Sequence, residues 1–254
     1  MAHIISIVNQ KGGVGKTTTA INLAAYLAEQ GKRVLVVDMD PQGNATSGLG
    51  VDHKTLPEGI YEVLVFEPKK ITEVIKMVSD NLHIAPSTPN LAGATIDLVN
   101  HPTREYVLQQ NLQEIAPYYD FVLIDNPPSL GLLTINGLVA CKHVLIPVQC
   151  EYYALEGLGQ LLNTIRLIKD SLNPDIQVLG AVLTMFDGRN KLSEAVFQEL
   201  YQYFPNKIFR SVIPRNVRLA EAPSHGISIR EYDTHSRGGQ AYQQLATEII
   251  QAYA

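Results

Sequence analysis

A glycine-rich run near the start of the chain sets the tightest limit on its fold. The run, Lys11–Thr18 (KGGVGKTT), lies between a short apolar segment, 4–8, and an Ala- and Leu-rich segment, 20–28. Its glycines allow backbone conformations that a β-carbon forbids, so successive N–H groups can converge on phosphate oxygens. The helix that follows would point its positive end at the same oxygens. The run therefore predicts a phosphate-binding loop between a strand and a helix.

Two positions in this loop carry specific chemistry. Lys16 is placed to reach the β- and γ-phosphates, and the Thr17 hydroxyl is placed to ligate Mg²⁺. The strict pattern G-x-x-x-x-G-K-[ST] does not hold, because its first glycine is replaced by Gln10. A second lysine, Lys11, stands at the mouth of the loop instead. An ordinary phosphate loop has no need of two cations, although a lone lysine here would be read as a solvated surface residue.

Composition places the chain among ordinary globular proteins. Its 254 residues are 46% hydrophobic and 18% charged, which excludes disordered and fibrous classes. We expect one domain over 1–254. No apolar run is long enough to span a membrane and no basic leader is visible, so we expect a cytoplasmic protein. Cys141 and Cys150 lack metal-ligand spacing and predict buried thiols, the alternative being ligands of a cluster shared between two subunits.

Short apolar runs alternate with helical patterns along the chain. The expected strands are 4–8, 34–37, 82–85, 121–124, 144–148, 178–183 and 208–213. The expected helices are 18–30, ended by Gly31, then 155–171 and 241–253. Alternating strands and helices predict parallel pairing, and nearly continuous apolar strands predict burial on both faces. The predicted fold class is α/β, a three-layer, doubly wound and predominantly parallel sheet with ligands at the carboxyl ends of its strands.

Carboxylates follow two of these strands. Asp38 directly follows strand 34–37, and Asp40 lies two residues further on. Asp125 directly follows strand 121–124. Each carboxylate alone could cap a helix or hold a turn. Because all three fall on the edge that carries the Lys11–Thr18 loop, together they favour a site for Mg²⁺ and a nucleotide.

Basic residues gather in one part of an otherwise acidic chain. The net charge is −5, yet six basic and three acidic residues between 187 and 218 give that stretch 6 − 3 = +3. The basic residues are Arg189, Lys191, Lys207, Arg210, Arg215 and Arg218. A solvated face explains such a run as readily as a binding surface does.

With these motifs the chain resembles ParA/Soj-type partition ATPases, which carry a deviant Walker A loop on a P-loop NTPase fold. The resemblance extends over nearly the whole length. The supporting stretches are 11–18, 38–46, 124–129, 147–157 and 213–226. One departure is Asn126, where the family usually carries Cys or Thr after the Walker B aspartate. Asp125 itself is retained.

The resemblance implies a role for each polar residue of the site. Lys16 and the loop amides would bind the phosphates of ATP, Thr17 would hold Mg²⁺ directly, and Asp125 would hold it through water. Asp40 would position the attacking water. Lys11 would reach the nucleotide of a partner protomer, so that a sandwich dimer forms only with ATP.

The resemblance also implies three sets of binding residues. The residues implied at the nucleotide are Lys11, Gly12, Gly13, Val14, Gly15, Lys16, Thr17, Thr18, Thr184, Met185 and Pro214. Of these, Thr184, Met185 and Pro214 would lie near the adenine. Arg189, Lys191 and Arg218 would contact DNA without regard to sequence.

The expected function is therefore that of a DNA-segregation ATPase. Its ATP-bound homodimer would associate with the nucleoid and leave it on hydrolysis stimulated by a ParB/Spo0J-like centromere-binding protein. One alternative is a relative that positions a protein cargo on the nucleoid. Another is a MinD-like membrane switch, which needs a basic amphipathic helix at the C-terminus, whereas no cation follows Arg237. A metabolic ligase of the same fold would have no use for the basic run.

Overall fold

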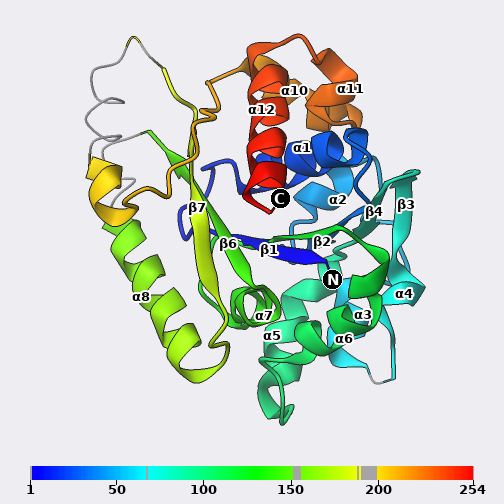
Figure 1. The fold of residues 1–254 in the computed structure, drawn as a ribbon. Coiled ribbons are helices and arrows are strands. Elements are labelled where there is room, and N and C mark those ends of the chain that lie inside the picture. The colour runs from blue at the N-terminus through cyan, green and yellow to red at the C-terminus, as the bar shows by residue number, and fades with distance from the viewer. Residues whose placement is uncertain (1, 67, 151–155, 188, 190–198, 254) are drawn as a thin grey trace.

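The computed structural model describes residues 2–66, 68–150, 156–187, 189 and 199–253 (Figure 1). Its strands form one seven-stranded sheet in the order β3-β4-β2-β5-β1-β6-β7. The strands are β1 (His3–Ile7), β2 (Val34–Asp38), β3 (Lys76–Ser79), β4 (Leu82–Ala85), β5 (Phe121–Asp125), β6 (His143–Gln149) and β7 (Gln177–Thr184). All neighbouring pairs are parallel except β3 and β4.

Helices connect the strands and cover the sheet. The α-helices are α1 (Lys16–Glu29), α2 (Asn44–Gly48), α3 (Ile60–Val65), α4 (Ile71–Val74), α5 (Ala94–Asp97), α6 (Val107–Ile115), α7 (Leu132–Ala140), α8 (Glu156–Ser171), α10 (Val217–Glu221), α11 (Ile229–Asp233) and α12 (Arg237–Ala252). Short 3₁₀ turns are η1 (Pro89–Gly93), η2 (Leu98–Asn100), η3 (Ala116–Tyr118) and η5 (Ala222–His225). Across the described ranges, none of the helices combines the length and the apolar character that a bilayer-crossing segment needs.

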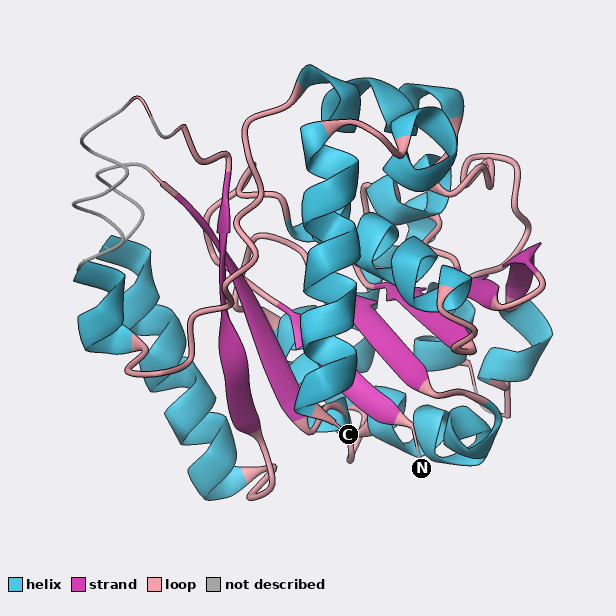
Figure 2. Cartoon of the chain, turned by 45° about the horizontal axis from the view of Figure 1, so that its top comes forward, coloured by secondary structure: helices cyan, strands magenta, loops and turns pink. Residues whose placement is uncertain are grey.

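Helices lie on both faces of the sheet (Figure 2). Side chains of α1, α2, α10, α11 and α12 pack with one set of strand residues, and those of α3 to α8 pack with the other set, so an apolar layer lies on each face. Successive residues of β5 enter opposite layers, for Leu123 faces the first and Ile124 the second, as the two-residue period of a strand requires. The three-layer, mostly parallel α/β fold is confirmed.

The structure corrects the strand prediction at both ends of the sheet. Residues 208–213, predicted as a strand, run beside β7 but hydrogen-bond to it only near Ala181 and Leu183, so no continuous ladder forms and only isolated bridges remain. Strand β3 was not predicted. It is four residues long and pairs antiparallel with β4. The Met77 side chain is 73% exposed, so the sequence shows no run of buried apolar residues that would predict a strand here.

Local chemistry explains where the predicted helices begin and end. Helix α1 begins at Lys16 because Gly15 holds a left-handed conformation, φ 90°, and it ends before Gly31 at φ 78°, the position that favours glycine after a helix. Helix α12 begins at Arg237, four residues before the predicted start, because the Ser236 hydroxyl accepts a hydrogen bond from the Gly239 N–H at 3.1 Å.

The two cysteines are buried thiols, as predicted. Burial raises the pKa of Cys141 to about 12 and that of Cys150 to about 11. Both thiols therefore stay protonated and unreactive at neutral pH.

Asn126 joins the end of β5 to its neighbours in the core. Its Nδ2 donates to Ser6 Oγ at 2.8 Å and to the Ile7 carbonyl at 3.0 Å, while its buried Oδ1 has no hydrogen-bond partner in the described chain. That oxygen lies against Gly137 of α7, where a β-carbon would overlap it. The departure from the family pattern at position 126 therefore requires glycine at position 137.

This contact predicts a difference between two helical glycines. Gly137→Ala should lower the free energy of unfolding by about 1–3 kcal/mol, because Asn126 is held by its own bonds and cannot yield. Gly159→Ala, on α8, is the matched control. Among the described residues, no atom outside the neighbouring part of its own helix lies within 4 Å of the site of its β-carbon, so it should stabilise by about 0.5–1 kcal/mol. Urea denaturation measures both, and equal effects at the two positions would contradict the packing described.

Candidate active site

The glycine-rich loop folds as an anion cradle. Gly13 and Gly15 adopt left-handed conformations with φ of 74° and 90°, which turn successive peptide groups inward. From Gly12 to Thr17, no backbone N–H donates a hydrogen bond to the described part of the chain. These N–H groups and the start of α1 together form a site that fits phosphate oxygens.

Lys16 lies over this loop with little access to solvent. The side chain is largely buried, the residue being 6% exposed, and its Nζ donates to the Lys11 carbonyl at 3.1 Å. Burial lowers the pKa of Lys16, and the carboxylates of Asp125 and Asp40 oppose that shift. The lysine is thus a partly desolvated cation with two carboxylates nearby and an anion cradle beneath it.

Two buried carboxylates meet beside the loop because of strand register. Asp38 of β2 pairs directly with Asp125 of β5, and both side chains are fully buried. Neither oxygen of Asp125 has a hydrogen-bond partner in the described chain. Burial is the main cause that raises the pKa of Asp125, and the charge of Asp38 raises it further. The Thr17 hydroxyl lies close enough to lower this pKa in part, although it does not meet the geometry of a hydrogen bond.

Such an orphaned carboxylate calls for a partner, because buried polar groups are almost always satisfied. A hard cation between Thr17 and Asp125 would supply one, and hydroxyl and carboxylate oxygens are the ligands that Mg²⁺ prefers. The residues present therefore fit the magnesium ion that the sequence predicts.

Asp40 presents one free oxygen to the same region. Its Oδ1 accepts a hydrogen bond from the Gln42 N–H at 3.0 Å, whereas Oδ2 accepts none from the described residues. The residue is 8% exposed, and its negative charge raises the pKa of Lys16. Asp40 can therefore accept a hydrogen bond from a water near the phosphate cradle.

A cleft of about 330 Å³ opens beside the loop. Its lining comes from the loop and the start of α1, from the end of β7, and from α10, the segment before it and α12. The lining residues are Gly15, Thr18, Thr184, Met185, Ile213, Pro214, Arg215, Asn216, Val217, Leu219, Ala220 and Tyr242. Thr184, Met185 and Pro214, predicted near the adenine, thus share one cleft with the loop. Thr184 Oγ1 donates to the Val14 carbonyl at 2.8 Å, and Met185 holds a strained φ of 52°.

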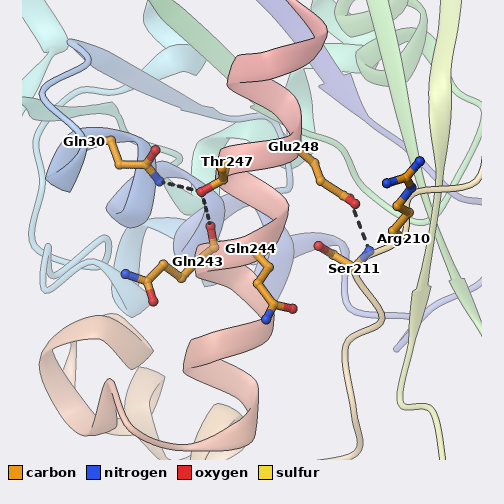
Figure 3. Close-up of a pocket in the computed structure, with 7 residues that line it drawn as sticks. All are labelled: Gln30, Arg210, Ser211, Gln243, Gln244, Thr247 and Glu248. Carbon is orange, nitrogen blue, oxygen red and sulfur yellow. Dashed lines mark hydrogen bonds between the residues drawn. The ribbon is translucent and has the colours of Figure 1, made fainter.

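A larger cleft of about 460 Å³ lies on the outer side of α12 (Figure 3). It is lined by Gln30, Arg210, Ser211, Gln243, Gln244, Thr247 and Glu248. None of the loop residues lines it. The smaller cleft is the nucleotide candidate because it alone of these two adjoins the phosphate cradle.

The predicted DNA-contacting residues are not arranged as a bare cationic patch. Arg189 is 91% exposed at its side chain and bonds Asp187 through two guanidinium nitrogens at 2.9 and 2.7 Å, which lowers the pKa of Asp187 to about 2. Arg218 is half exposed and donates to Glu221 at 2.9 Å. Lys191 lies outside the described residues.

One brace of the loop was not predicted. Asn9 Nδ2 donates to the Pro147 carbonyl at 2.8 Å, and its Oδ1 accepts the Lys11 N–H at 3.0 Å. The side chain thus fixes the entry of the loop to the end of β6. Its partner is 138 positions away in sequence, so only the place of Asn9 directly before the loop could have suggested the role.

Comparison with known proteins decides the family. A family model described as an AAA domain matches residues 2–178. The sporulation initiation inhibitor protein Soj of Bacillus subtilis (strain 168) is 54% identical, over 98% of each chain. The chromosome-partitioning ATPase Soj of Thermus thermophilus is 51% identical, over 97% of this chain and 94% of its own. The chain belongs to the Soj/ParA family of partitioning ATPases.

A solved structure supports the fold of this Soj/ParA-family ATPase. Cobyrinic acid a,c-diamide synthase from Mycobacterium smegmatis, crystallised with ADP and magnesium, superposes with a TM-score of 0.88 at 36% identity, covering 100% of this chain and 96% of its own. The resemblance inferred from the sequence motifs, and the P-loop fold that it implies, are confirmed.

The orphaned carboxylate yields a stability prediction. Asp125→Asn replaces a buried charge by a neutral amide of the same shape, so without nucleotide it should raise the free energy of unfolding by about 1–3 kcal/mol. Added MgATP should stabilise the original chain far more than the variant, because the variant lacks the carboxylate that would hold the magnesium ion. Thermal unfolding with and without MgATP measures both effects. A less stable apo variant, or equal stabilisation by MgATP, would contradict this account.

Proposed function

We propose that this Soj/ParA-family ATPase is an ATP-driven DNA-segregation switch. ATP and Mg²⁺ bind at the described cradle, two protomers close on two nucleotides, and the dimer holds DNA without sequence preference. Hydrolysis, stimulated by a centromere-binding partner similar to ParB, returns the monomer. The observation that carries the proposal is the orphaned Asp125 carboxylate beside a phosphate loop with a second lysine. The names of the relatives as chromosome-partitioning ATPases add support.

Each residue of the cradle has a defined task in this proposal. The loop N–H groups and Lys16 hold the phosphates, and Thr17 and Asp125 hold the magnesium ion, which when bound neutralises phosphate charge. Asp40 accepts a hydrogen bond from the attacking water through Oδ2. The cleft lined by Thr184, Met185 and Pro214 takes the base.

Lys11 acts across the dimer. Its backbone is anchored to Asn9 at the mouth of the loop, so its side chain starts where a facing protomer would meet the phosphates. A cation delivered in trans stabilises the charge that develops during phosphoryl transfer, as an arginine finger does. Closure of the dimer and hydrolysis then both depend on ATP.

Substitution of the two lysines should separate binding from dimerisation. Lys11→Ala should bind ATP as the original chain does but remain monomeric and inactive, because the cation in trans is missing. Lys16→Ala should lose ATP binding itself. Equilibrium binding of a fluorescent ATP analogue and sedimentation velocity in MgATP measure the two steps. A normal ATP dimer for Lys11→Ala would remove Lys11 from the interface.

The DNA surface is proposed to form around Arg189, Arg215 and Arg218. Arg215 lies near enough to the Arg189–Asp187 pair to contribute to the low pKa of Asp187. Exposed ion pairs such as Arg189–Asp187 and Arg218–Glu221 contribute little to stability in water, because solvent and salt screen them. DNA is a polyanion and presents a stronger negative field than a single carboxylate does. Its phosphates can therefore replace Asp187 and Glu221 as the partners of the two arginines. A dimer doubles these contacts, which makes weak binding useful.

Charge reversal tests this surface. Arg189→Glu or Arg218→Glu should abolish DNA retention by the ATP dimer while ATP binding and dimerisation persist. The alanine variants should flatten the slope of log K against log salt by about 1.8, which is about 0.9 for each phosphate contact and two contacts in a dimer.

Arg166→Glu is the matched control for this test. Arg166 lies on α8, is 80% exposed at its side chain and also pairs with an aspartate, but α8 packs on the other face of the sheet from α10. This variant should retain DNA. If all three reversals weaken binding equally, net charge rather than a defined surface holds the DNA.

A further inference from the structure

A single carboxylate closes the loop that carries Asp40. Asp38 Oδ1 accepts the Asp40 N–H at 3.2 Å, and Asp38 Oδ2 accepts both the Thr46 N–H at 2.8 Å and the Thr46 hydroxyl at 2.7 Å. Asp38 and Thr46 are both fully buried. The two ends of the segment 40–46 are therefore held on the two oxygens of one side chain.

The Thr46 hydroxyl makes a second bond to a third part of the chain. Its oxygen accepts the backbone N–H of Ser87 at 3.0 Å. The hydroxyl hydrogen is used on Asp38, and one of the two lone pairs of the oxygen accepts the Ser87 N–H. Through one atom, Thr46 joins the end of β2, the helix α2 and the segment that follows β4.

Within the loop itself the hydrogen bonds are mostly local. The N–H groups of Gln42 and Gly43 bond back to Asp40, and Gly43 holds a left-handed turn whose β-carbon position is filled by the His53 ring. The upstream side is tied to β5, because the Met39 N–H donates to the Asp125 carbonyl at 2.9 Å. The downstream tie to the sheet is Thr46.

We infer that Thr46 is a positioning residue for ATP hydrolysis. Its hydroxyl holds the Asp40 loop against β2 and the end of β4, so that Asp40 Oδ2 stays directed at the water beside the phosphate cradle. Thr46 itself touches no reacting atom. This inference rests on the proposed role of Asp40, which the experiment below tests separately.

Three variants test the role of the hydroxyl. Thr46→Val keeps the shape of the side chain and removes the hydroxyl, and it should lower kcat by about tenfold to a hundredfold, the loss expected when a catalytic group is misplaced by about 1 Å. The KM for ATP should change less than about twofold, because the phosphate loop is untouched. Thr46→Ser keeps the hydroxyl and should retain kcat. Asp40→Ala, run in parallel, should stop hydrolysis while ATP still binds.

Steady-state hydrolysis of MgATP gives kcat and KM, and single-turnover hydrolysis, with the rate expressed per ATP bound, gives the rate of the chemical step. That normalisation separates positioning from folding, because a partly unfolded sample loses ATP stoichiometry and not the rate of its folded fraction. If Thr46→Val does not yield folded protein, Thr46→Ala is measured in the same way.

Two outcomes would overturn the inference. One is a rate for Thr46→Val within about twofold of the original chain at full ATP stoichiometry. The other is a rate for Thr46→Ser as low as that for Thr46→Val. Continued hydrolysis by Asp40→Ala is a different result, since it would remove Asp40 from the proposed mechanism whatever Thr46 does.

Discussion

The pairing of β5 with β1 on one side and β2 on the other is the constraint on which the site depends. This register places Asp125 beside both Ile7, the last residue of β1, and Asp38, the last residue of β2. A slip of one residue would turn these side chains to the other face of the sheet. Asn126, directly after β5, helps to hold this register, because its Nδ2 donates to Ser6 Oγ and to the Ile7 carbonyl of β1.

That register stores electrostatic strain at the carboxyl edge of the sheet. Burial raises the pKa of Asp38 to about 6 even though three hydrogen bonds favour its charged form, and Asp125 accepts no such bond from the residues that the structure describes. When the pKa of a carboxyl is higher in the folded than in the unfolded state, the protein loses stability as the pH rises from the unfolded to the folded pKa. The apo protein therefore carries a cost at neutral pH that a cation at Asp125 would relieve, which links magnesium binding to the stability of the site.

Sequence patterns predicted the parts of the site that local chemistry controls. The loop glycines, the lysine and threonine after them, and carboxylates at strand ends all act over short stretches, so their spacing is visible in one dimension. Asn9, Thr46 and Ser87 were not predicted, because the bond of Asn9 to Pro147 spans 138 positions and the bond of Ser87 to Thr46 spans 41. Residues 208–213 were overpredicted for a related reason, since apolar character indicates burial beside β7 but not a continuous ladder.

The segment 213–218 connects the two surfaces that the proposed function requires. Pro214 lines the cleft proposed to take the base, and Arg215 donates its N–H to the Phe186 carbonyl at 3.1 Å next to the Arg189–Asp187 pair. Two residues later α10 begins, with Asn216 capping the Arg218 N–H at 2.8 Å. A base in the cleft and a phosphate on the arginines would therefore contact one short, hydrogen-bonded piece of backbone. In the proposed cycle, a nucleotide-dependent shift of Pro214 would therefore move Arg215 and Arg218 directly, because they belong to the same short segment.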